Sequence, residues 1–311
     1  MKTSNLAISA SYFHKDPPLR SAVRLMEVGF KRLEFDGQEL KDLSVSEFKE
    51  LSLTLEGAEV ACSAVNVVGD LMPISLGNLA AFGNRERRNA VAHVKACIDL
   101  AVRLKCGRVV CDLGSSTEDL FSFEKQNDQL ASSIEEILSD TGGVSVVLLN
   151  VPGRRWLAWN GLPPDPSRVV ERYVWPWRMW FDEEKLVADI STRLATMVRW
   201  AFDCANEVVA HGSNKFRLED AVIPYLDQGL EMVYLANHSG PYNRVWHRSL
   251  LHQSLSDGFF TSQDYAALFS LLGKRNFAGE VCLKISEKNP SESLLQRNLK
   301  LIEQWRVIRA G

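Results

Sequence analysis

The sequence predicts a single closed (β/α)₈ barrel. Eight short apolar, β-branched segments alternate with eight longer segments of helical period within 311 residues, which is the count of a closed parallel barrel. Segment 144–149 is apolar except for Ser145, as expected of a parallel strand buried on both faces. No glycine-rich phosphate loop follows an early strand, which disfavours the alternative of an open doubly wound sheet.

The first half of the chain gives clear boundary signals. The first four strands are expected at 6–12, 32–35, 59–67 and 108–111. The helices that follow them are expected at 19–27, 44–55, 85–105 and 123–139. Gly29 is placed to end the first helix as a C-cap, and Ser44 with Glu47 forms a capping box for the second. The third helix has apolar residues close to a 3.6-residue period and ends at Gly107.

The second half repeats the alternation after the turn at Gly142-Gly143. Strands are expected at 144–149, 207–210, 231–236 and 279–285. Helices are expected at 182–202, at 218–227, from 262 onward and at 291–309. The chain is therefore expected to form one domain, 1–311.

One segment, 151–180, breaks this rhythm. It holds five of the eight tryptophans and five prolines. A loop of this length in a compact domain is usually functional, and so many aromatic residues favour order. As a lid, it would place Trp156 and Trp177 on a substrate ring while Arg154 meets a negative group. As an exposed aromatic surface, it would instead dock a second copy of the chain in a homodimer.

Composition excludes several classes of function. The net charge of −3 and the pI of about 6.1 do not support a nucleic-acid-binding surface. No apolar run approaches the length of a membrane span, and the apolar segment 6–12 is too short for a signal-peptide core. The six cysteines include no C-x-x-C pair, so we expect reduced, buried thiols and a cytoplasmic location.

Three segments resemble the xylose isomerase-like barrel family of sugar-phosphate isomerases and epimerases. Residues 29–34 (GFKRLE) resemble its helix-to-strand signature, in which a glycine leads into a strand that ends in an acid. Residues 88–107 (RNAVAHVKACIDLAVRLKCG) resemble the helix before strand 4. Residues 255–286 resemble its C-terminal signature, a glycine-bearing turn, a helix and a glycine before strand 8.

The resemblance implies a divalent metal site that this sequence does not preserve. The family takes a Glu after strand 5, an Asp and often a His after strand 6, a His after strand 7, and a Glu after strand 8. Here those places hold Leu149 or Asn150, then His211 with Asn214, then Asn237-His238, and finally Lys284. An ammonium group repels a cation in a low-dielectric cleft, so we expect neither a metal ion nor another cofactor.

The strand ends of a barrel line one mouth, where chemistry takes place. Lys284 is expected there as a general acid/base or oxyanion clamp, with a structural ion pair to Glu34 or Asp112 as the alternative and a Schiff-base role as a third. His211 directly follows the apolar run 207–210, which favours a ligand-facing imidazole over a core histidine. We therefore assign His211 and Lys284 as the catalytic acid/base pair.

The remaining mouth residues are expected to orient the catalytic base or to bind substrate. Glu34 matches the acid of the family signature and is expected to orient the base, as is Asp112, whose alternative is a turn or cap. Hydrogen bonds to substrate oxygens are assigned to Asn150, Asn214, Asn237 and His238.

These assignments predict a metal-independent isomerase, epimerase or dehydratase of carbohydrate or biosynthetic metabolism. Proton abstraction next to a carbonyl of a small polyhydroxylated molecule is the reaction that the resemblance implies. Two alternatives stay open: a catalytically inactive barrel that binds a ligand or a protein, and a barrel re-purposed for a bulkier aromatic substrate. A nuclease role is disfavoured, because the metal ligands are missing and the chain is not basic.

Overall fold

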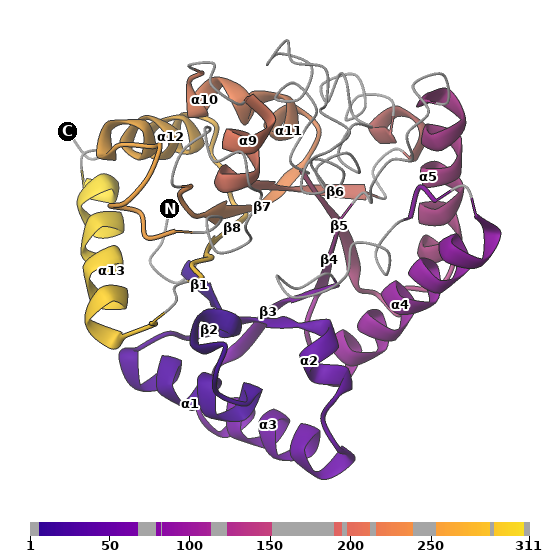
Figure 1. Ribbon diagram of the computed structural model, residues 1–311, viewed down its shortest axis with the longest axis horizontal. Coiled ribbons are helices and arrows are strands. Elements are labelled where there is room, and N and C mark those ends of the chain that lie inside the picture. The colour runs from indigo at the N-terminus through magenta and orange to yellow at the C-terminus, as the bar shows by residue number, and fades with distance from the viewer. Residues whose placement is uncertain are drawn as a thin grey trace, which may run out of the picture.

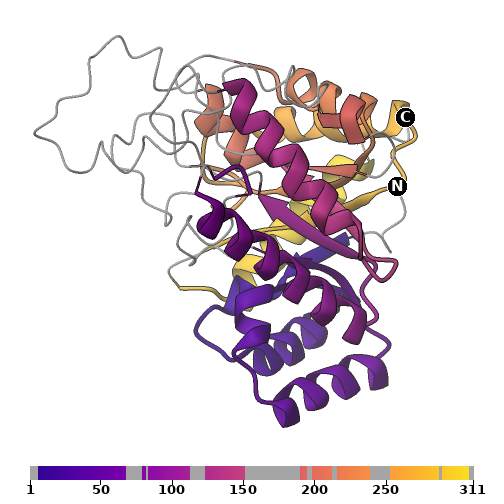
Figure 2. The ribbon, with the colours of Figure 1, turned by 90° about the vertical axis from the view of Figure 1, so that its right-hand side faces the viewer.

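The chain forms a closed barrel of eight parallel strands, paired in chain order from β1 to β8, with β8 pairing back to β1 (Figure 1). The computed structural model describes residues 6–67, 79–81, 83–112, 123–150, 190–194, 198–211, 216–238, 253–286 and 289–307. In the described chain, helices surround the strands on the outside (Figures 1 and 2). The predicted fold class is confirmed.

The strands are β1 (Leu6–Ser9), β2 (Arg32–Asp36), β3 (Ala61–Asn66), β4 (Arg108–Asp112), β5 (Ser145–Leu149), β6 (Val198–Asp203), β7 (Leu230–Leu235) and β8 (Glu280–Leu283). The α-helices are α1 (Pro18–Val28), α2 (Gly37–Lys41), α3 (Val45–Gly57), α4 (Asn84–Arg103), α5 (Phe123–Leu138), α9 (Cys204–His211), α10 (Leu218–Ala221), α11 (Ile223–Asp227), α12 (Ser262–Lys274) and α13 (Glu292–Val307). A 3₁₀ helix, η2 (Ala10–Phe13), follows β1.

Two local signals in the first half are confirmed, whereas the third was wrong: α4 ends at Arg103, and Lys105 instead of Gly107 takes the left-handed conformation after it. The Ser44 hydroxyl accepts from the backbone N–H of Glu47, whose carboxylate accepts from the Ser44 backbone N–H, so the capping box is complete. Gly29 ends α1 with a φ of 108°, which favours glycine because it lies in the left-handed region.

The predicted position of the sixth strand was wrong. The sequence favoured a helix at 182–202 and a strand at 207–210, but the strand is β6 (Val198–Asp203), and 207–210 lies within α9. The β-branched pair Val208-Val209 imitates a strand, but Val208 is buried on the inner side of a helix. Asp203 starts that helix, since its Oδ1 accepts from the backbone N–H of Ala205 at 2.8 Å.

Two other elements are shorter than predicted. The first strand ends at Ser9, and the following residues form η2. The predicted helix 218–227 is two short helices, α10 and α11, because Pro224 stands at the start of α11 and cannot donate a hydrogen bond to the preceding turn.

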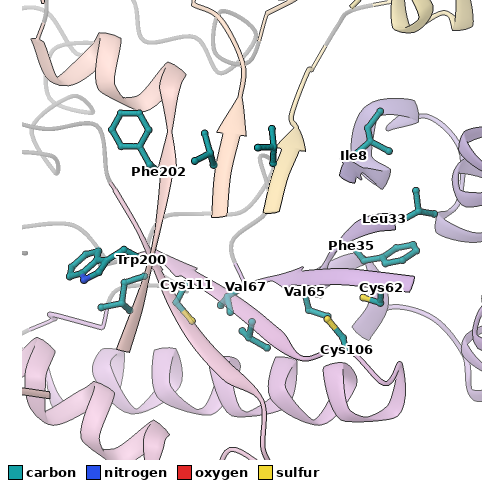
Figure 3. Packing of buried hydrophobic residues seen from close by; sticks show 14 of the residues in the cluster. Ile8, Leu33, Phe35, Cys62, Val65, Val67, Cys106, Cys111, Trp200 and Phe202 are labelled. Atoms are coloured by element: carbon teal, nitrogen blue, oxygen red, sulfur yellow. The ribbon is translucent and has the colours of Figure 1, made fainter. Parts of the chain in front are cut away.

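The apolar side chains form two separate cores. The larger one lies between the strands and the surrounding helices and contains Leu33, Phe35, Trp200 and Phe202 (Figure 3). The smaller one fills the barrel interior. Its members are Ala7, Ala64, Val110, Val147, Leu149, Ala201, Met232, Tyr234 and Cys282. Because strand residues alternate between the two faces, this set identifies which positions point inward.

Charged side chains close the amino-terminal end of the barrel. Arg32 donates two hydrogen bonds to Glu280, at 2.9 and 2.7 Å, and Arg108 donates a third at 2.7 Å. The Arg108 guanidinium also lies 3.1 Å from Glu231. Glu280 is only 3% exposed, so these two guanidinium groups compensate a buried charge. No helix of the described segments has both the length and the apolarity that a membrane crossing requires.

Candidate active site at the carboxyl ends of the strands

Polar side chains line the barrel interior at the carboxyl ends of the strands. On most strands, the polar residue lies two positions after the last inner-core residue, so strand alternation points its side chain into the barrel. Tyr234 is itself part of the inner core, and Glu34 is placed by its direct contact with Tyr234. They are Ser9, Glu34, Asn66, Asp112, Asp203, Tyr234 and Lys284. Lys284 follows β8 directly, and its backbone N–H continues the ladder by donating to the Leu235 carbonyl at 3.0 Å. In barrel enzymes this end of the strands carries the chemistry.

An acid, a phenol and an ammonium group converge within this layer. The Tyr234 hydroxyl donates to Glu34 Oε2, and Lys284 Nζ lies 4.9 Å from the centroid of the Tyr234 ring. The three residues come from β2, β7 and the end of β8, and none is more than 5% exposed. Burial, reinforced by the charge of Glu34, raises the pKa of Tyr234 well above its ordinary value. At neutral pH the phenol is therefore a proton donor in this group.

A second network joins the ends of β5 and β6. The Asn150 amide donates to the Asp203 carbonyl and to Glu207 Oε2, both at 3.2 Å, and its oxygen accepts from the Asp203 backbone N–H at 2.6 Å. Asn206 donates to the Asn150 carbonyl at 2.9 Å. The Asn150 side chain, which we assigned to substrate, therefore makes hydrogen bonds that hold Asp203 and Glu207 in place.

The correction of strand 6 changes which residue stands at that strand's end. His211 is the last residue of α9 and does not follow a strand, so the positional argument for its catalytic role was wrong. Its role stays a prediction. Asp203 now ends β6, which is where the family resemblance implied an aspartate.

Asn237 is also occupied by the fold. Its amide donates to the carbonyls of Leu255 and Phe260, at 3.3 and 2.9 Å, and its oxygen accepts from the backbone N–H groups of His238 and Phe260, at 2.9 and 3.0 Å. The segment after β7 packs so closely here that a Cβ on Gly258 would lie 2.5 Å from Asn237 Cγ. These hydrogen bonds favour a structural role for Asn237, and its assignment to substrate stays a prediction.

Asn237→Ala is expected to lower the free energy of unfolding by about 2–4 kcal/mol, because it leaves buried donors and acceptors without hydrogen-bond partners. Urea unfolding measures the change. Asn89→Ala, on the exposed face of α4, is the matched control and should leave stability equal or slightly higher. A loss of substrate affinity at unchanged stability would return Asn237 to the substrate-binding set.

The other predicted site residues divide into two groups. Asp112 ends β4 and is half-buried, and His238 follows β7 and is 8% exposed, so both lie at the mouth as expected. Arg154, Trp156, Trp177 and Asn214 lie outside the described residues.

Sequence reasoning missed Tyr234, Asp203 and Glu207. Tyr234 has a signal, because it is the last aromatic residue of an apolar strand and has the inward parity of Met232. Asp203 and Glu207 were hidden by the misplaced strand 6.

Among the residues that the structure describes, the side chains at the mouth do not fit a divalent metal ion. Within the described ranges, no three His, Cys, Asp or Glu side chains are grouped so that they would hold one. One oxygen of Asp203 accepts from backbone N–H groups, and an ammonium group stands after β8. A cation at this place would meet Lys284 instead of a carboxylate.

Comparisons with known proteins agree with the fold. The sequence profile of the xylose isomerase-like TIM barrel matches residues 23–305. A D-tagatose 3-epimerase-like protein is similar in structure, with a TM-score of 0.68, 15% identity and 98% of each chain covered. D-psicose 3-epimerase from Clostridium cellulolyticum H10 has a TM-score of 0.69 and 12% identity, with 98% of this chain and 99% of that one covered. For a 3-keto-D-glucoside 4-epimerase from E. coli the values are 0.65 and 14%, with 97% and 99% covered. No curated protein sequence matches.

Proposed function

The chain belongs to the xylose isomerase-like TIM barrel family, and from that premise we propose that it is a metal-independent isomerase or epimerase of a small polyhydroxylated carbonyl compound. The observation that carries this proposal is the convergence of Lys284, Tyr234 and Glu34 inside the carboxyl end of the barrel. The structurally similar proteins are sugar epimerases or epimerase-like, which supports a sugar as the substrate class.

Lys284 is assigned to the developing negative charge. Abstraction of a proton next to a carbonyl gives an enediolate, and its oxygen is stabilised by a preorganised charged donor in a water-poor site. Lys284 is 5% exposed and is held against the Tyr234 ring, so little reorganisation is needed when the charge forms.

Glu34 and Asp203 are assigned to proton transfer. In a closed barrel of eight strands, β2 and β6 stand on opposite walls, so the two carboxylates approach a bound substrate from opposite sides. Glu34 takes the proton from one face of the carbon, and Tyr234 holds that carboxylate in position through its hydroxyl. Return of a proton from Asp203 to the other face gives the epimer, and return to the neighbouring carbon gives the isomer. Asp112 and His238 are assigned to substrate hydroxyls.

The proposal is tested by incubating the protein with a panel of ketoses, ketose phosphates and keto-glycosides, and by following new isomers by NMR. Glu34→Gln is expected to lower kcat by about 10²-fold or more, because an amide cannot accept the proton. Glu50→Gln, on the exposed surface of α3, is the matched control and should leave kcat unchanged.

Two outcomes would count against the proposal. An active enzyme whose Glu34→Gln variant keeps full kcat would remove Glu34 from the reaction. Binding of a compound without turnover, seen as thermal stabilisation alone, would favour the inactive binding barrel.

A further inference from the structure

Asn150 holds the backbone of Asp203 from the neighbouring strand. Asn150 directly follows β5, and its backbone N–H continues the ladder to β6 by donating to the Ala201 carbonyl at 3.1 Å. Its side-chain oxygen accepts from the Asp203 N–H at 2.6 Å, and its side-chain nitrogen donates to the Asp203 carbonyl at 3.2 Å. The backbone of Asp203 is therefore fixed on both sides of its Cα atom.

The orientation of the Asn150 amide is set by its partners. The amide oxygen faces one donor, the Asp203 N–H, whereas the amide nitrogen faces two acceptors, the Asp203 carbonyl and Glu207 Oε2. A flipped amide would lose all three hydrogen bonds. Asn206 adds another bond by donating to the Asn150 backbone carbonyl at 2.9 Å. Asn150 is fully buried and Glu207 is 4% exposed, so water competes little for these bonds.

The Asp203 carboxylate follows its own backbone. Its Oδ1 accepts from the backbone N–H groups of Ala205 and Asn206, at 2.8 and 3.4 Å, and so caps the start of α9. Because the carboxylate is tied to the first turn of this helix, a shift of the backbone at the end of β6 moves the carboxylate as well. Loss of the Asn150 amide would therefore displace the Asp203 carboxylate.

We propose that Asn150 is a positioning residue for the second proton transfer and does not itself touch the substrate. This role rests on the proposed function, in which Glu34 takes a proton from one face of the substrate and Asp203 returns a proton from the opposite wall. Proton transfer needs the two groups within hydrogen-bond reach, and a misplacement of about 1 Å can cost about 10²-fold in rate. Glu34 is held separately, by the Tyr234 hydroxyl, so Asn150 governs the Asp203 step alone.

The test separates the two proton transfers by deuterium exchange in D₂O. Asn150→Leu keeps the approximate shape of the side chain and removes its three hydrogen bonds. The compound whose hydrogen faces Glu34 should still exchange that hydrogen at the wild-type rate. Exchange in its reaction product, which depends on Asp203, should fall by about 10²-fold, and so should conversion in either direction. NMR measures these rates on one preparation.

Glu34→Gln provides the opposite contrast. It should remove exchange in the first compound and keep exchange in the product, which is the mirror image of the result for Asn150→Leu.

Asn298→Leu is the matched control for the loss of a buried amide. Asn298 is fully buried on α13, where its side chain bonds to the backbone of Leu255 and Leu294. Its replacement should lower stability and leave the ratio of the two exchange rates unchanged, because partial unfolding lowers both rates by the same factor. Asn150→Ser, whose side chain is too short to bond both sides of Asp203, should shift the ratio in the same direction as Asn150→Leu, which covers the case in which the leucine variant does not fold.

Two results would overturn this role. If the Asn150 variants lose both exchange rates equally, or lose neither, Asn150 does not position Asp203, and the proposed function still stands. If the wild-type protein exchanges no compound of the panel, the proposed function fails and the role of Asn150 fails with it.

Discussion

Lys284→Met is expected to remove nearly all turnover, by about 10²–10³-fold in kcat, while the barrel stays folded. The substitution keeps the length and apolar stem of the side chain but removes the positive charge at the end of β8. Loss of one oxyanion donor costs about 10²–10³-fold in kcat. Methionine is tolerated in an apolar environment, so the expected change in thermal unfolding is small. Steady-state kinetics and circular dichroism on the same preparation measure both quantities.

Lys274→Met is the matched control for this experiment. Lys274 is exposed at the end of α12, and its replacement should change neither kcat nor the unfolding temperature. If Lys284→Met retains full kcat, Lys284 does not stabilise the transition state. If the variant unfolds, the structural ion pair that the sequence left open is its main role.

Glu280→Ala is expected to destabilise the barrel strongly. The substitution leaves Arg32 and Arg108 facing each other at the amino-terminal end of the barrel without the carboxylate that both contact at 2.7 Å. Removing one partner of a buried charge network costs about 3–5 kcal/mol, and partial exposure of the two arginines brings the expected loss to about 2–4 kcal/mol. Chemical denaturation measures the free energy of unfolding.

The pH dependence of this effect has a definite sign. Burial acts to raise the pKa of Glu280, but the hydrogen bond from Arg32 and the charge of Arg108 outweigh it, so the folded-state pKa is lowered. The stabilisation is therefore complete above the ordinary pKa of an unfolded glutamate and is lost as the pH falls toward the lowered value. Wild type and Glu280→Ala should converge in stability in acid.

Glu56→Ala is the control for a surface ion pair. Glu56 contacts Lys105 at 2.8 Å, but both side chains are exposed, so its loss should not measurably change stability. Equal effects of the two substitutions would show that the Glu280 network does not stabilise the barrel.

The barrel was predictable because its signals are local and repeated. The glycine after α1, the capping box of α3 and the apolar run of β5 each indicate one element, and the alternation of elements then indicates the topology. The prediction of strand 6 failed because Arg199 and Trp200 give β6 a mixed polar and apolar pattern, whereas the β-branched pair in α9 resembles a strand. Asp203, which separates the two elements, is both a strand end and a helix cap.

The candidate site was predictable only where strand ends were placed correctly. Glu34 and Lys284 were found because β2 and β8 were found. Whether a polar side chain is available to substrate depends on contacts far apart in the sequence, which periodicity does not encode. Asn150 bonds to Glu207 across 57 positions, and Asn237 bonds to Phe260 across 23. The sequence gives no sign of these hydrogen bonds, which both amides make within the fold.

The most direct measurement is deuterium incorporation into the substrate in D₂O, followed by NMR, with protein that has been freed of metal ions by a chelator. We expect the chelated wild-type protein to exchange the hydrogen next to the carbonyl at the same rate as the untreated protein, and we expect Lys284→Met not to exchange it at that rate. Exchange that appears only after a divalent ion is added back would contradict the assignment of the charge-stabilising role to Lys284.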